Sequence, residues 1–186
     1  MPLGIIITIV VLLVFALLVA LATTYNSLVR CRNKVEEAFA TMDVYLKQRW
    51  DLVPNLVETV KGYAKHEKTL LEEIVKMRNG SYNKMSNEEK LEANSQLTRG
   101  ISKIMALAED YPELRASDNF KELSTQLTEI EKDIASSRKY YNGAVKEMNN
   151  KVDSFPTNLV AGIMGFERQK SFTASQTERE NVKVEF

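Results

Sequence analysis

The run from Leu3 to Ala22 reads LGIIITIVVLLVFALLVALA and contains no charged side chain. About twenty apolar residues in a helix extend over roughly 30 Å, the thickness of the hydrocarbon core of a bilayer. Because the run begins at the third residue, we expect all of the working domain to lie on one side of the membrane. The sequence therefore predicts one N-terminal anchor, residues 1–24. The residues taken to represent the span are Leu3, Ile7, Leu12, Phe15, Leu18 and Ala22.

A cleaved signal peptide is the alternative to a permanent anchor. Ala20-Leu21-Ala22 matches the small-x-small pattern of a cleavage site. However, Met1-Pro2 lacks the basic residue that begins a signal peptide, and the apolar run is longer than a usual signal core. These two features favour a retained anchor.

The charges next to the span predict its orientation. Arg30, Arg32 and Lys34 follow the apolar run, and no basic side chain precedes it. The positive-inside rule then places the C-terminal domain of this single-pass protein in the cytoplasm. Cys31 is the only cysteine, which excludes an internal disulfide and fits a reducing compartment.

Beyond the anchor, composition and periodicity predict an all-α fold. The chain has 7 Gly, 4 Pro, 25 basic and 25 acidic residues, which favours long helices and argues against nucleic acid as a partner. Apolar residues recur at heptad spacing in two segments, as in a helix seam. The first seam contains Leu28, Val35, Phe39, Met42, Leu46, Arg49, Val53 and Leu56. The second contains Phe120, Leu127, Ile134, Tyr141, Met148 and Phe155. We predict that the membrane helix continues into an elongated bundle of about four helices, residues 25–166, before a polar tail, residues 167–186.

Local signals set the limits of the helices. Asn79-Gly80 is typical of a turn, and the segment from Ser86 to Glu89 fits a capping box. Pro54 lies within the first seam, where either Asp51 caps a new helix or the helix kinks. We expect the last long helix to end near Phe155-Pro156.

Several sequence blocks are familiar in this order. They include DLVPNLVE at Asp51–Glu58, VKGYAKHE at Val60–Glu67 and YPEL at Tyr111–Leu114. From about Tyr25 to Phe166 the chain resembles the bacterial LemA family of membrane proteins. The resemblance implies one membrane helix, a helical-bundle domain usually assigned to the cytoplasm, and no known catalytic residue to carry over. Genes of the family often neighbour those of a TPM-domain membrane protein or an HtpX-like membrane protease, which hints at envelope maintenance.

The residue types that carry chemistry are scarce. His66 is the only histidine, and Leu70 stands where a helical zinc site would place a second one. Cys31 has no histidine neighbour, and a diiron bundle would require two Glu-x-x-His motifs. The sequence therefore predicts no catalytic residue, no metal and no cofactor.

Four polar residues fall on the two seams: Arg32, Arg49, Ser137 and Lys151. A buried arginine requires a carboxylate partner. We therefore hypothesise that Arg49 pairs with an acid on the second long helix, such as Glu129 or Asp133; alternatively, the seam turns outward at Arg49.

Long helical faces predict a non-enzymatic, membrane-anchored scaffold or self-assembling protein. We expect a homo-oligomer whose spans lie side by side in the bilayer, with the segment from Leu159 to Phe166 at a contact or on the membrane surface. Another envelope membrane protein is a further expected partner. The alternative function is an adaptor or regulator of a membrane protease or other envelope enzyme, and a hydrolase ranks third.

Overall fold

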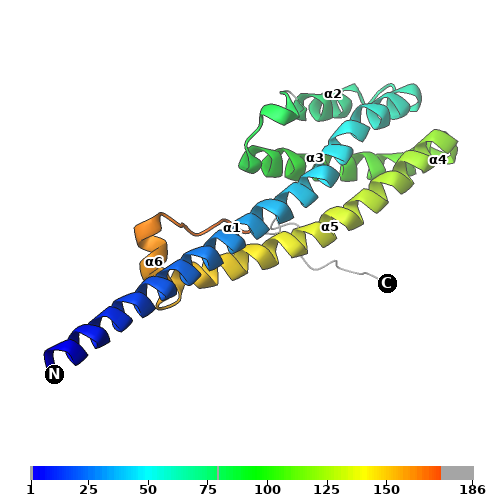
Figure 1. The fold of residues 1–186 in the computed structure, drawn as a ribbon. Coiled ribbons are helices and arrows are strands. Elements are labelled where there is room, and N and C mark those ends of the chain that lie inside the picture. The colour runs from blue at the N-terminus through cyan, green and yellow to red at the C-terminus, as the bar shows by residue number, and fades with distance from the viewer. Residues whose placement is uncertain (1, 79, 173–186) are drawn as a thin grey trace, which may run out of the picture. The chain divides into compact units, whose positions relative to one another are not determined.

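The computed structural model describes residues 2–78 and 80–172, and all of their regular structure is helical (Figure 1). The α-helices are α1 (Pro2–Tyr63), α2 (Lys68–Met77), α3 (Asn87–Asp110), α4 (Pro112–Ala116), α5 (Asp118–Asp153) and α6 (Thr157–Met164), with a 3-10 turn η1 (Tyr82–Lys84). The predicted all-α class is therefore confirmed. Most of the predicted tail, residues 173–186, lies outside the described residues.

Helix α1 joins the apolar run to the first seam without interruption. No glycine or proline stands between Ala22 and Leu28, so nothing in the sequence stops the helix where the apolar run ends. Pro54 lies inside α1, where its ring removes one backbone donor but does not end the helix. Asp51 therefore caps no new helix; its carboxylate instead pairs with Lys47 one turn earlier.

The ends of the other helices follow the local signals. Ser86 and Glu89 form the expected capping box, with Ser86 N–H donating to Glu89 Oε2 at 2.7 Å and Glu89 N–H to Ser86 Oγ at 3.3 Å. Gly80 has a φ of 128°, as expected at a turn, whereas Asn79 lies outside the described residues. Gly165 ends α6 with a φ of 71°, a left-handed conformation that suits glycine.

The chain divides into two compact units. The first unit comprises Met1–Phe39 and Lys139–Ser171, so it contains the start of α1, the end of α5 and all of α6. Lys151 Nζ lies 2.5 Å from Ser27 Oγ, and the rings of Tyr141 and Phe39 are 5.8 Å apart. These pairs run in opposite order along the two helices, so α5 is antiparallel to α1 in this unit.

The second unit comprises Ala40–Arg138 and Phe172–Phe186, with the rest of α1, the start of α5, and α2, η1, α3 and α4. Its core combines side chains from all of these elements. Its largest apolar side chains with less than 2 % exposure are Met42, Leu46, Val53, Leu56, Ile74, Leu97, Ile104, Leu114 and Ile134.

Gly100 allows α2 and α3 to approach closely in the second unit. A Cβ atom there would lie 3.0 Å from Ile74 Cγ1 and 3.6 Å from Met77 Sδ, and the Ile74 side chain is fully buried. We expect Gly100→Val to lower the free energy of unfolding by about 2 kcal/mol through overpacking. Gly143→Val is the matched control, because a Cβ atom at this exposed position of α5 meets nothing within 4 Å. It should change stability by less than about 0.5 kcal/mol. Equal losses in urea unfolding of the two variants would contradict this assignment.

Candidate functional site

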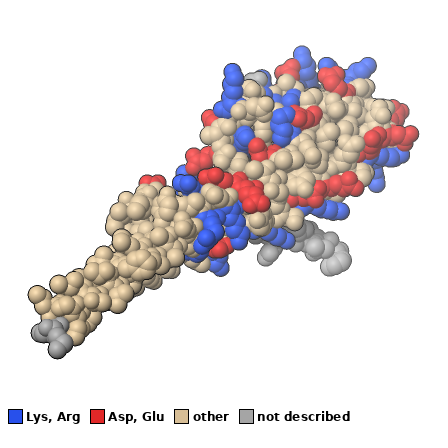
Figure 2. Space-filling model, viewed as in Figure 1, with Lys and Arg blue, Asp and Glu red and all other residues tan. Residues whose placement is uncertain are grey.

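The first surface of functional interest is the N-terminal part of α1. Every side chain from Leu3 to Ala22 is exposed in the isolated chain, and the most apolar stretch has a mean hydropathy of 3.4. Figure 2 shows no charged residue over this part of the helix on the face drawn. By length and composition, α1 is the one helix within residues 2–78 and 80–172 that meets the requirements for crossing a membrane. All six residues predicted to represent the span lie on this surface.

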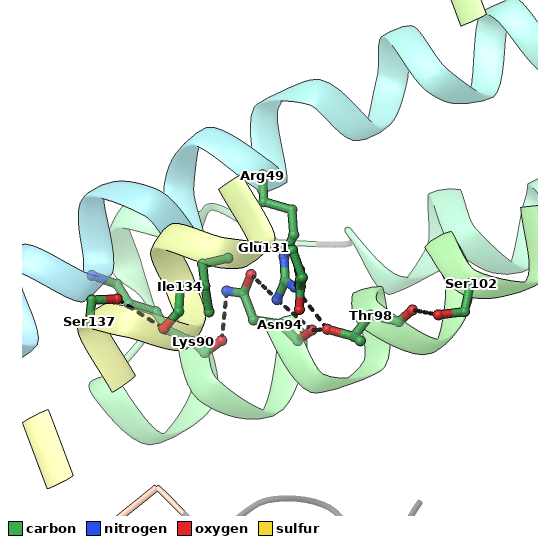
Figure 3. Close-up of polar contacts among 8 residues, drawn as sticks. All are labelled: Arg49, Lys90, Asn94, Thr98, Ser102, Glu131, Ile134 and Ser137. Carbon is green, nitrogen blue, oxygen red and sulfur yellow. Dashed lines mark hydrogen bonds and ion pairs between the residues drawn. The ribbon is translucent and has the colours of Figure 1, made fainter. Parts of the chain in front are cut away.

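The second feature is a buried polar network around Arg49 in the second unit (Figure 3). The Arg49 side chain is 2 % exposed, and its Nη1 donates to Glu131 Oε2 at 2.5 Å and to Thr98 Oγ1 at 2.8 Å. Its Nη2 donates to the main-chain oxygen of Asn94 at 2.9 Å and to Asn94 Oδ1 at 3.1 Å. The guanidinium therefore connects α1 to α3 and α5 in the interior of one unit.

Neighbouring side chains hold the acceptors of this network in place. Asn94, itself buried, donates from Nδ2 to the main-chain oxygen of Lys90 at 2.9 Å, which directs its Oδ1 toward Arg49. Thr98 donates to the main-chain oxygen of Asn94 at 3.1 Å. Burial lowers the pKa of Arg49, and the charge of Glu131 opposes that effect. Ser137, the other buried polar residue of the seams, satisfies its hydroxyl locally by donating to the main-chain oxygen of Ile134.

The hypothesis that Arg49 pairs with an acid on the second long helix is confirmed by Glu131 of α5, but neither of the two acids named as examples is the partner. Glu129 and Asp133 are both exposed, and Glu131 between them reaches the guanidinium. Glu131 follows Leu127 by four residues and precedes Ile134 by three, so it shares their face of α5. Both neighbours in that seam, Leu127 and Ile134, are buried. This spacing is the signal in the sequence that could have identified Glu131 as the partner.

A second polar cluster lies on η1 and the adjoining helices of the same unit. Asp43 accepts from the Tyr82 hydroxyl at 2.8 Å and from Lys90 Nζ at 2.7 Å. Burial, and then the hydrogen bond to Asp43, raise the pKa of Tyr82. The Tyr82 ring also lies 5.3 Å from that of Trp50, over which Arg78 sits at 5.4 Å. The cluster attaches η1 to α1 and α3 through one carboxylate.

The predicted seam residues are buried with one exception. The buried members are Leu28, Val35, Phe39, Met42, Leu46, Arg49, Val53, Leu56, Phe120, Leu127, Ile134, Tyr141 and Met148. Phe155 is 80 % exposed, because α5 ends at Asp153 and the heptad pattern does not continue past that residue. Phe155 is therefore not a seam residue.

The remaining polar seam residues are Arg32 and Lys151, and both lie in the first unit. Lys151 is half-buried beside Ser27. Arg32 is exposed; it lies 3.8 Å from Glu36 and over the Phe166 ring at 5.6 Å. Glu147 accepts from Lys34 at 2.7 Å, and this hydrogen bond lowers the pKa of Glu147 and raises that of Lys34. Cys31 is buried beside them, with its Sγ 3.8 Å from Glu147 Oε1. A buried thiol next to a carboxylate is unsuited to act as a nucleophile.

A groove of about 490 Å³ lies between the end of α1 and α2 in the second unit. Its floor is apolar, formed by Val57, Ala64 and Leu71, and lysines and glutamates form its rim. None of its lining residues carries a hydroxyl, a thiol or an imidazole. The groove therefore lacks the Ser, Thr or Cys nucleophile and the histidine base of the common hydrolase triads. Nor does any group of three or more His, Cys, Asp or Glu side chains in the described part of the chain have the geometry of a metal site. His66 is exposed at a turn.

The fold and these features define an all-α protein with one N-terminal helix that is long and apolar enough to cross a membrane. A family model described as the LemA family matches residues 38–186. The chain therefore belongs to the LemA family, and the resemblance seen in its sequence blocks is confirmed.

Named relatives support the same assignment. Magnetosome protein MamQ 2 of Paramagnetospirillum magneticum is 26 % identical over 199 residues, covering 92 % of this chain and 72 % of the relative. Protein LemA of Metamycoplasma hominis is 27 % identical over 158 residues, covering 84 % of this chain and 72 % of the relative. Magnetosome protein MamQ of Magnetospirillum gryphiswaldense is 24 % identical over 197 residues, covering 92 % and 72 %. None of these names states an enzymatic activity.

Proposed function

We propose that this protein is a non-enzymatic scaffold or self-assembling protein of the bacterial cell envelope, anchored in the membrane by α1. The observation that carries the proposal is the continuity of α1 from Pro2 to Tyr63. The same helix supplies an exposed apolar span and buried core residues of both units, including Leu28 and Leu56. A span that continues directly into a folded core holds that core at the membrane surface.

The proposed location is the inner membrane, with the C-terminal domain in the cytoplasm. Arg30 and Arg32 are exposed within ten residues of Ala22, and Lys34 follows them. Basic residues this close to a span favour the cytoplasmic side. Fusion of a reporter that is active only in the cytoplasm to the C-terminus should give an active product; an active periplasmic reporter at the same position would contradict the orientation.

Self-association is the proposed mode of action. Spans that share one membrane are confined together, which raises the local concentration of the attached domains.

Full-length purification in a mild detergent tests the proposal. We expect light scattering to give a protein mass of at least two chains, and cysteine crosslinking through the span to trap the same species in native membranes. A monomer in both measurements would contradict self-association. Stoichiometric co-purification with one other membrane protein, without self-association, would favour the alternative function of an adaptor or regulator of an envelope enzyme.

A further inference from the structure

A group of exposed apolar side chains lies at the end of the first unit. Phe155 and Ile163 are each 80 % exposed, and Leu159 and Met164 are 58 % and 56 % exposed. Leu159 and Ile163 are four residues apart in α6 and therefore lie on one side of it, and Phe155 lies in the short connection before the helix. Val160 and Ala161, on the opposite side of α6, are buried. An apolar face of this size on a short helix requires a covering environment.

The contacts of α6 place this face next to the span. The Phe166 ring, just after α6, lies 5.8 Å from the ring of Tyr25. Tyr25 follows Ala22, the last residue of the apolar run, by three residues, or about 5 Å along a helix. Lys151 contacts Ser27 near the end of α5, and α5 is antiparallel to α1 here. The chain after Lys151 therefore approaches the span, and Phe155 follows four residues later.

The chemistry of the surrounding surface matches the boundary between headgroups and acyl chains. No residue of α6 is charged, and in Figure 2 the surface there continues the uncharged surface of the N-terminal part of α1. Exposed Arg30 and Arg32 follow Ala22 by eight and ten residues, about 12 to 15 Å along the helix, where they can be attracted to anionic headgroups at the membrane surface. Tyr25 has the amphipathic ring that is enriched at this level.

We propose that Phe155 and α6 form a lipid-binding surface on the leaflet from which α1 emerges. The side chains of Phe155, Leu159, Ile163 and Met164 enter the upper acyl region, and α6 lies at the headgroup level. The first unit is then fixed to the bilayer at two places, the span and this surface. The inference depends on α1 being inserted, and it goes beyond the proposed scaffold function by naming a second contact with lipid.

Fluorescence quenching by lipid tests this proposal on the full chain. With Cys31→Ala as background, single cysteines are introduced as Ile163→Cys, Leu159→Cys, Gly143→Cys and Ala20→Cys and labelled with bimane. The protein is reconstituted into vesicles of phosphatidylcholine and phosphatidylglycerol, with or without phospholipid that carries a nitroxide high on its acyl chain. Gly143 is the matched control: it is exposed, it lies on α5 in the same unit, and it is about 18 Å of helix before Phe155.

We expect the nitroxide lipid to reduce the emission from positions 159 and 163 about threefold, with little change at position 143. Strong quenching at position 20 establishes insertion of α1 independently. Quenching at position 20 but not at 159 and 163 would overturn the proposal while leaving the anchor intact. If positions 159 and 163 were neither quenched by the nitroxide lipid nor accessible to aqueous iodide, a second copy of the chain would cover α6. That outcome would equally overturn the lipid contact.

Discussion

Replacing Glu131 with alanine is expected to lower the free energy of unfolding by about 2 to 3 kcal/mol, because the substitution leaves the buried guanidinium of Arg49 without a carboxylate. The three remaining acceptors, on Asn94 and Thr98, are neutral. They satisfy hydrogen bonds but do not balance the charge. Glu131 itself is 45 % exposed, so water partly replaces it, and the expected loss lies below that of a fully buried pair.

The measurement is urea unfolding of the full chain in mild detergent, followed by the fluorescence of Trp50. Trp50 is the only tryptophan and is buried in the same unit, so its emission reports unfolding of that unit. Glu129→Ala is the matched control, because Glu129 is an exposed glutamate on the same helix, two residues earlier. It should shift stability by less than about 0.5 kcal/mol. If both alanine variants unfolded alike, the buried guanidinium would not depend on its carboxylate.

The reverse substitution, Arg49→Met, completes the argument. Methionine removes the charge that had to be desolvated and retains much of the side-chain volume, while Glu131 is exposed enough to be hydrated. We therefore expect Arg49→Met to lower the free energy of unfolding by less than Glu131→Ala does. Adding Glu131→Ala to Arg49→Met should cause little further loss. If Glu131 mainly compensates the buried charge of Arg49, removing Glu131 costs more than removing Arg49. If the pair mainly contributes attraction, the two substitutions cost the same.

The helix limits of this chain are strongly local, which is why the sequence predicts them. The capping box at Ser86 and Glu89 and the turn at Gly80 need only neighbouring residues to form. The continuity of α1 also follows from the absence of a helix breaker after Ala22. Pro54 left two outcomes open, since local sequence does not reveal whether packing is sufficient to hold a helix together across a proline; here Val53, Leu56 and Val57 are all buried beside it.

The site was less predictable, because it depends on which helix faces meet. That Arg49 is buried and paired follows from its seam position, but its neutral acceptors come from α3, a helix with no role in either seam. The heptad pattern also predicted Phe155 as a seam residue, although α5 ends at Asp153 and Phe155 is exposed. A repeat of seven residues carries no information about where a helix ends, and only the following proline indicated that Phe155 leaves the helix.

Three lysines near the middle of the span are expected to release the protein from the membrane, whereas one is not. The run from Leu3 to Ala22 contains fifteen Leu, Ile, Val or Phe residues. At about 0.3 to 0.6 kcal/mol each, they favour insertion by roughly 5 to 9 kcal/mol. One lysine at the helix centre costs about 3 kcal/mol, so Leu12→Lys should remain in the membrane. Ile9→Lys, Leu12→Lys and Phe15→Lys together cost about 9 kcal/mol and should abolish insertion.

Flotation and alkaline carbonate extraction measure this difference, and Trp50 fluorescence provides the folding control. Because the span is exposed along its whole length in the isolated chain, the substitutions remove no contact from the core of either unit. The triple variant should therefore unfold in urea at the same midpoint as the parent chain while appearing in the soluble fraction. Loss of membrane binding together with loss of the folded signal would mean that the core requires the inserted span. Carbonate-resistant binding of the triple variant would show that residues outside Leu3–Ala22 hold the chain at the bilayer. The exposed apolar face of α6 is the surface that the structure offers for such binding.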